Sequence, residues 1–113
     1  MKNILFAGMI GVWATTAMAH SPLERTSPAD DAIITAVPSE VLFDFKGGIR
    51  LTRVTMIHNN HEATKLDLSG HAGFITNHAV PMPDLGHGDY LIEWRGLGLD
   101  GHALNGTISF TVK

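Results

Sequence analysis

A carboxylate and an imidazole lie two residues apart near the end of the sequence, at Asp100 and His102. The residue between them is Gly101, whose backbone freedom lets both side chains face one point. Carboxylate oxygen and imidazole nitrogen are ligands that suit a tetragonal Cu(II) site. Because Asp-Gly is also a common turn sequence, the tripeptide by itself is equally compatible with a plain turn.

The N-terminal segment 1–19 has the composition of a secretory signal peptide. It begins with a basic segment, continues with an apolar run at 4–12, and ends in Ala17-Met18-Ala19, whose small residues suit a cleavage site. The run is shorter than the roughly 20 residues needed to cross a bilayer, which disfavours an uncleaved membrane anchor. We therefore predict export, cleavage after Ala19, and a mature domain 20–113 that begins at His20.

A mature protein that begins at His20 offers a metal ion two nitrogens from one residue, the free α-amine and the imidazole. The ordinary pKa of such an amine is about 7.7–8.0, so a metal can displace its proton near neutral pH. A nitrogen from His102 and an oxygen from Asp100 complete a tetragonal set of nitrogen and oxygen ligands. The sequence therefore predicts one Cu(II) ion per mature chain, bound by these three residues, and zinc or nickel is also compatible with this ligand set.

Five further histidines lie in or beside turn-rich segments. They are His58, His61, His71, His78 and His87. None of them has a partner at a spacing typical of metal ligands, so we expect imidazoles on the surface or in turns. Whether any of the five binds metal is left open by the sequence.

Composition argues against several other chemistries. The sequence contains no cysteine, which excludes disulfides, thiolate zinc sites, iron–sulfur clusters and a cysteine nucleophile. A formal net charge of −3 argues against a nucleic-acid partner, which would require clustered basic residues. Ser69, His71 and Asp67 are the residue types of a hydrolase triad, but no nucleophile elbow or oxyanion signature accompanies them. These residues therefore do not predict a hydrolase.

Apolar residues recur with the period of two that is typical of half-buried strands. The clearest sets are Val41, Phe43 and Phe45; Tyr90, Ile92 and Trp94; and Ile108, Phe110 and Val112. Further strands are predicted at 51–58, 64–68 and 74–78, and turns at 46–48, 59–60, 69–70, 81–83, 86–88 and 100–101, where Gly, Asn or Pro gather. No segment has helical periodicity. We predict one all-β domain, a Greek-key β-sandwich of about seven strands, with a tyrosine corner in segment 84–90.

Two segments of the sequence carry motifs of a known family. The start of the mature chain is His20-Ser-Pro followed by Ser-Pro-Ala at 27–29, which is similar to the opening of the CopC family of periplasmic copper-binding proteins. The closing segment has the family's Tyr-x-x-x-Trp-Arg strand at 90–95, then Asp-Gly-His at 100–102, then Gly-x-x-x-Phe-x-Val at 106–112. The likeness covers nearly the whole mature chain, with the middle only loosely matched.

The resemblance implies a cupredoxin-like or immunoglobulin-like β-sandwich located in the periplasm. It implies Cu(II) binding through the N-terminal amine, His20, Asp100 and His102. It also implies a role in copper resistance, buffering or delivery, with a CopD-like inner-membrane protein as partner. We expect a monomer that carries one copper ion without catalytic turnover.

The sequence departs from the family pattern in three places. Pro22 stands where many relatives have a second histidine, and segment 81–83 is all that remains of a methionine-rich Cu(I) loop. Gly98 stands where many relatives have a serine, so a hydrogen bond that would steady Asp100 or His102 is expected to be missing. We expect a single Cu(II) site.

Two other functions remain compatible with the sequence. An N-terminal histidine plus a second histidine is also the ligand set of histidine-brace copper oxygenases, although Asp100 would occupy the position that oxygen needs. The other hypothesis is an exported β-sandwich that binds other molecules without a metal. For such a protein, replacing His102 by alanine would change neither thermal stability nor metal retention.

Overall fold

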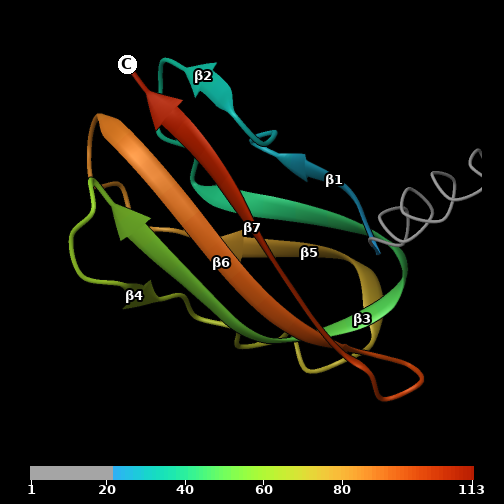
Figure 1. Ribbon diagram of the computed structural model, residues 1–113. Helices are drawn as coiled ribbons and strands as arrows, with labels where there is room; N and C mark the ends of the chain where they lie inside the picture. Colours follow the sequence, from blue (N-terminus) through green and yellow to red (C-terminus); the bar gives the residue numbers. More distant parts are fainter. Residues whose placement is uncertain (1–21) are drawn as a thin grey trace, which may run out of the picture.

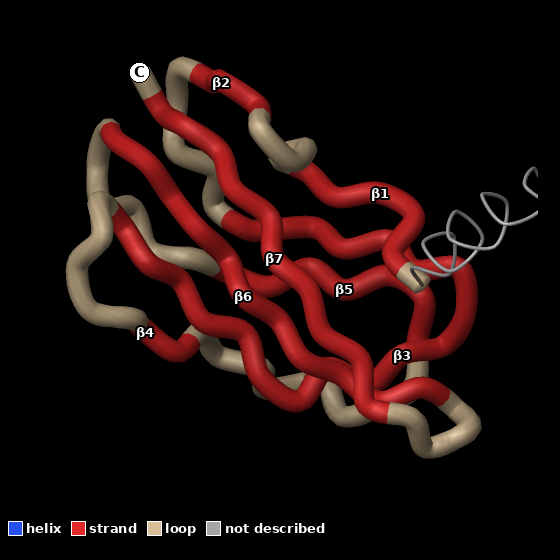
Figure 2. The backbone as a smooth tube through the Cα atoms, viewed as in Figure 1, coloured by secondary structure: helices blue, strands red, loops and turns tan. Residues whose placement is uncertain are grey.

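The computed structural model describes residues 22–113, so the predicted signal peptide and His20 lie outside the described residues. All regular elements of residues 22–113 are β-strands (Figure 1), joined by the loops drawn in Figure 2. The strands are β1 (Leu23–Ser27), β2 (Ala32–Ile34), β3 (Glu40–His58), β4 (Thr64–Lys65), β5 (Ile75–Pro81), β6 (Gly88–Gly98) and β7 (Ala103–Val112). Across this part of the chain, no helix has the length and apolar character required to span a membrane.

The long strand β3 organises the fold. Hydrogen bonding gives the strand order β1-β3-β6-β7-β2, and β4 and β5 also pair with β3. The first half of β3 pairs with β1 and β5, whereas its second half pairs with β4 and β6. Because one strand belongs to both halves, the sheet curls over into two layers, as Figure 1 shows. The predicted all-β Greek-key sandwich of about seven strands is confirmed.

The predicted turn at 46–48 is wrong, because β3 continues through these residues. Gly47 and Gly48 instead lie where β3 passes from its β1 and β5 partners to its β6 partner. Glycine inside a strand often marks such a tight bend, since it has no side chain to crowd the fold. A Cβ atom at residue 48 would lie 3.1 Å from the carbonyl oxygen of Phe74, whereas one at residue 47 would meet nothing within 4 Å, so Gly48 is the glycine that this close approach requires.

The smaller elements also differ from expectation. Only Thr64–Lys65 of the predicted strand 64–68 pairs in a sheet, and the strand predicted at 74–78 runs instead from Ile75 to Pro81. The short strand β2 pairs in parallel with β7 and had no period-two signal. Short strands have too few residues to display a periodicity, so tertiary contacts decide them.

Alternating apolar residues from both layers meet in the core. The aromatic and aliphatic sets predicted on β3, β6 and β7 are all buried, which confirms their inward orientation. The rings of Phe45 and Trp94, from opposite layers, pack edge to face with centroids 5.2 Å apart. On the second half of β3, a bulge at Thr52 turns Leu51, Val54 and Met56 inward.

The predicted tyrosine corner is present. The Tyr90 hydroxyl donates to the carbonyl of Gly86 at 2.6 Å and accepts from the backbone N–H of Leu85 at 3.2 Å. The ring is buried and stacks on Phe110 with centroids 5.1 Å apart. These contacts anchor the start of β6, the strand that leads to Asp100.

The β6–β7 hairpin carries the predicted metal ligands at its tip. The two strands pair continuously from Gly88 opposite Val112 to Leu97 opposite Ala103. Gly101 has a φ of 85°, a left-handed conformation that glycine adopts without strain. The N–H of Gly98 donates to the carbonyl of His102 at 3.0 Å and closes the base of the turn.

Candidate metal centre

Asp100 and His102 form a hydrogen-bonded pair at the tip of the β6–β7 hairpin. Nδ1 of His102 lies 2.7 Å from Oδ2 of Asp100, and the backbone N–H of His102 donates to Oδ1 at 3.1 Å. The side chain of His102 is 81% exposed and that of Asp100 is 68% exposed, so a dissolved ion can reach both. When the imidazole is neutral and Nδ1 carries the proton, Nε2 holds the free lone pair.

The two groups shift each other's pKa values. Hydrogen bonds from the His102 ring and backbone lower the pKa of Asp100. The hydrogen bond to the Asp100 carboxylate, together with its negative charge, raises the pKa of His102. Asp100 is therefore ionised at neutral pH, which is the form that binds a metal cation.

The described chain begins at the same end of the sheet as the hairpin tip (Figure 1). The carbonyl of Pro22 accepts a hydrogen bond from the N–H of Lys46 at 2.8 Å. Three residues further along β3, Ile49 pairs with Gly98 at the base of the hairpin. Since three strand residues span about 10 Å, Pro22 enters the sheet close to the predicted ligands.

Gly98 provides the space that the Asp100 carboxylate occupies. A Cβ atom at residue 98 would lie 3.0 Å from Oδ1 of Asp100, tighter than ordinary van der Waals contact. A serine at this position would therefore push on the carboxylate as well as offer it a hydroxyl.

Replacing Gly98 by alanine is expected to displace Asp100 and weaken Cu(II) binding about tenfold, because support of a ligand commonly contributes that much. The measurement is a Cu(II) titration of the protein that begins at His20. Gly47→Ala is the matched control, since a Cβ there meets nothing within 4 Å. Equal affinities for the two variants would show that the Gly98 space does not matter.

His78 contradicts the expectation of a surface imidazole. Its side chain is 1% exposed, and its Nε2–H donates to the carbonyl of Ile49 at 2.7 Å. Its Nδ1 lies 3.0 Å from Nδ1 of His71, so one ring donates to the other. Burial lowers the pKa of His78, which keeps the ring neutral. Alternation along β5 turns His78 inward, where its ring and the Phe45 ring pack edge to face with centroids 5.9 Å apart.

His58, His61 and His87 lie at the other end of β6 from the hairpin tip. The His58 ring donates through Nε2 to the carbonyl of His87 at 2.9 Å and packs on Tyr90, which pairs with His58 across the sheet. The side chains of His61 and His87 are exposed, as the sequence indicates. Tyr90 and Gly98 are eight residues apart on one strand, which corresponds to about 26 Å.

Within residues 22–113, no three His, Asp or Glu side chains gather closely enough to hold a metal ion. Asp100 and His102 are thus brought together as predicted, whereas His20 lies outside the described residues. The Asp67 carboxylate accepts a hydrogen bond from the Ser69 hydroxyl in a local turn. No hydrogen bond within residues 22–113 joins Ser69 to His71. The rejected hydrolase triad is therefore not assembled.

The fold and the pair define a class of small all-β domains that present an aspartate and a histidine on an exposed hairpin tip. The family model of the CopC domain matches residues 23–113, and the chain belongs to this family. The family consists of copper-binding resistance proteins found in the periplasm, which are not enzymes.

Relatives of known name match over most of their length. Copper resistance protein C of Escherichia coli is 25% identical over 131 residues, covering 99% of this chain and 96% of the relative. Copper resistance protein C of Pseudomonas syringae pv. tomato is 28% identical, and the match covers 98% of this chain and 93% of the relative. Protein YobA of Escherichia coli K12 is 29% identical, covering 84% and 80%.

Solved structures support the fold. The crystal structure of CopC from Methylosinus trichosporium OB3b matches with a TM-score of 0.69 at 24% identity, over 83% of this chain and 94% of that chain. PcoC from Escherichia coli, described as a copper resistance protein, matches with a TM-score of 0.58 at 21% identity, over 82% and 100%.

Proposed function

We propose that this protein is a periplasmic Cu(II) carrier that acts in copper resistance, buffering or delivery. The observation that carries the proposal is the exposed Asp100–His102 pair at the hairpin tip, in a chain that belongs to the CopC family. Relatives named copper resistance protein C match almost the whole chain, which supports copper as the ion.

The spacing of the pair fits one metal ion. Two neighbouring ligands of a tetragonal ion, each about 2.0 Å from the metal, lie about 2.8 Å apart. Oδ2 of Asp100 and Nδ1 of His102 are 2.7 Å apart. Replacing the shared proton by Cu(II) therefore leaves the distance between the two ligand atoms nearly unchanged, while the imidazole and the carboxylate turn toward the ion. The close pair His71 and His78 differs, because the His78 ring is buried and its other nitrogen is bound to Ile49.

We propose that the α-amine and imidazole of His20 complete the site after removal of residues 1–19. Two arguments support this: the pair provides only two donors, and Pro22 enters the sheet at the end where the hairpin tip lies. One Cu(II) ion would then bind to three nitrogens and one oxygen.

A carrier fits this ligand set better than a histidine-brace oxygenase. An oxygenase needs an open position for oxygen, and the Asp100 carboxylate would fill the fourth tetragonal position. The exposed tip suits transfer of the ion to another protein, and we propose a CopD-like inner-membrane protein as the recipient.

The proposal is tested with two forms of the protein, one beginning at His20 and one with a single glycine added before His20. We expect tight 1:1 Cu(II) binding and a nitrogen-rich tetragonal electron paramagnetic resonance signal for the first form. The extra glycine converts the His20 amine to an amide and is expected to weaken binding at least about a hundredfold.

Equal binding by both forms would remove the amine from the site. Absence of binding by either would leave a β-sandwich without a copper function.

A further inference from the structure

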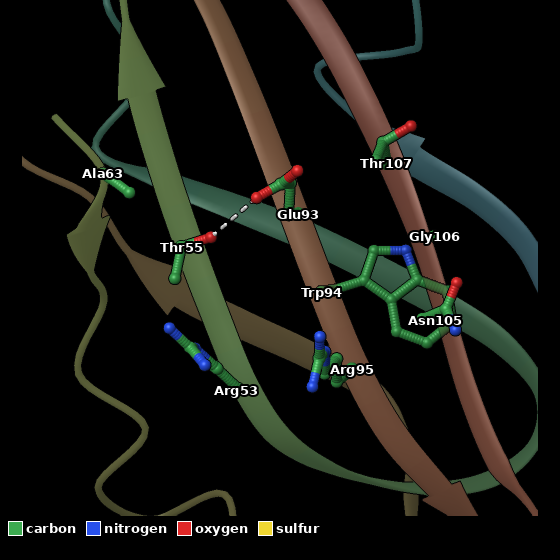
Figure 3. Close-up of a pocket in the computed structure, with 9 residues that line it drawn as sticks. All are labelled: Arg53, Thr55, Ala63, Glu93, Trp94, Arg95, Asn105, Gly106 and Thr107. Carbon is green, nitrogen blue, oxygen red and sulfur yellow. Dashed lines mark hydrogen bonds between the residues drawn. The ribbon is translucent and has the colours of Figure 1, made fainter. Parts of the chain in front are cut away.

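We propose that the outer face of the sheet formed by β3, β6 and β7 binds an oxyanion, a carboxylate or phosphate group, between Arg53 and Arg95. A groove of about 350 Å³ lies on this face, and Figure 3 shows the residues that line it. Neither Asp100 nor His102 lines this groove, and the proposal does not depend on the copper function.

The register of the sheet places the two arginines side by side. Arg53 of β3 pairs directly with Arg95 of β6, which pairs in turn with Asn105 of β7. All three side chains are exposed on the outer face, because their neighbours Val54, Trp94 and the other alternate residues turn into the core. Three hydrogen-bond donors therefore follow one row across three strands.

Three of the four arginines lie on this face of a chain whose formal net charge is −3. Of the four arginines in the sequence, Arg53 and Arg95 line the groove and Arg50 is exposed one outward step further along β3. The fourth, Arg25, lies in the other layer and forms an ion pair with Asp44 at 2.7 Å.

Neither groove arginine forms an ion pair within the described part of the chain. The ion pairs of residues 22–113 are Arg25 with Asp44 and Asp100 with His102. Glu93 also lines the groove, yet its carboxylate accepts from the Thr55 hydroxyl at 3.4 Å, and no ion pair joins it to either arginine. Like charges directly opposite each other destabilise a sheet. An anion bound between the two guanidinium groups would reduce this repulsion.

The chemistry of the donors defines the ligand. Guanidinium groups present paired N–H donors that match the oxygens of a carboxylate or a phosphate. The amide of Asn105 adds a neutral donor, and the groove of about 350 Å³ is larger than a single carboxylate or phosphate group requires. The groove is open at the surface, so the oxyanion can belong to a free ion or to a larger molecule.

The test titrates the metal-free protein with inorganic phosphate and, separately, with acetate. Nitrogen–proton NMR signals of the Arg53 and Arg95 side chains and of the Asn105 amide are followed. We expect saturable shifts that sodium chloride at equal ionic strength does not reproduce. Saturation by phosphate alone would assign a phosphate ligand, and saturation by acetate alone would assign a carboxylate. Saturation by both would show that the groove recognises the oxyanion chemistry that the two ligands share.

Arg53→Gln and Arg95→Gln are each expected to weaken the binding about tenfold or more. Arg25→Gln is the matched control, because it removes the same charge from an arginine outside the groove, and we expect less than a twofold change. The melting temperature of both groove variants should stay equal or rise, since a repulsive pair is removed.

Shifts that sodium chloride reproduces, or equal weakening by Arg25→Gln, would overturn the proposal. A clear loss of thermal stability in both groove variants would assign the arginines a structural role instead.

Discussion

Replacing His102 by alanine is expected to lower the Cu(II) affinity of the protein that begins at His20 by at least about a hundredfold. The change removes one of four proposed ligands and also the hydrogen-bond partner of the Asp100 carboxylate. Because the His102 side chain is 81% exposed, its loss should leave the melting temperature of the metal-free protein nearly unchanged. Competitive titration against a chelator of known affinity measures the first effect, and thermal unfolding the second.

Two further variants make this result specific. Asp100→Asn keeps the size of the side chain but removes its charge, so we expect a smaller loss, about tenfold. His87→Ala removes an exposed histidine at the far end of β6 and should leave the affinity within about twofold. Retention of wild-type affinity by His102→Ala, or an equal loss in His87→Ala, would contradict the proposed site.

Replacing His78 by leucine is expected to reduce the free energy of unfolding by about 2 kcal/mol, because it leaves the Ile49 carbonyl without its side-chain donor in the core. The substitution also removes the hydrogen bond between His78 and His71. Urea unfolding at pH 7.5 measures the loss.

The pH dependence of stability provides a second measurement on His78. Burial lowers the pKa of His78 in the folded protein below its ordinary value of 6.5. The unfolded chain therefore binds a proton more readily, so the contribution of His78 is fully present above pH 6.5 and is lost as the pH falls from 6.5 toward the folded pKa. The raised pKa of exposed His102 acts in the opposite direction.

Comparison of variants isolates the effect of His78. Unfolding is measured between pH 5 and pH 7.5, and we expect the leucine variant to lose less stability on acidification than the unsubstituted protein. His61→Ala, which removes an exposed imidazole, should retain the unsubstituted pH dependence. A leucine variant with unchanged stability and unchanged pH dependence would show that the buried ring has no such role.

The sequence by itself determined the class of fold and two members of the candidate site. Period-two alternation at Phe43, Trp94 and Phe110 follows directly from the geometry of a half-buried strand, so the inward residues were predictable. Asp100 and His102 were predictable as a pair because one glycine separates them, and local geometry suffices to bring them together.

Only the tertiary structure decided the features that depend on residues far apart in the sequence. The bend of β3 at Gly48 depends on pairing with strands on both sides, and the burial of His78 depends on Phe45, Ile49 and His71, which contact its ring. The pairing of Arg53 with Arg95 joins residues 42 positions apart through a register that a bulge at Thr52 shifts. A single bulge reverses which side chains face outward, and local sequence does not specify where it occurs.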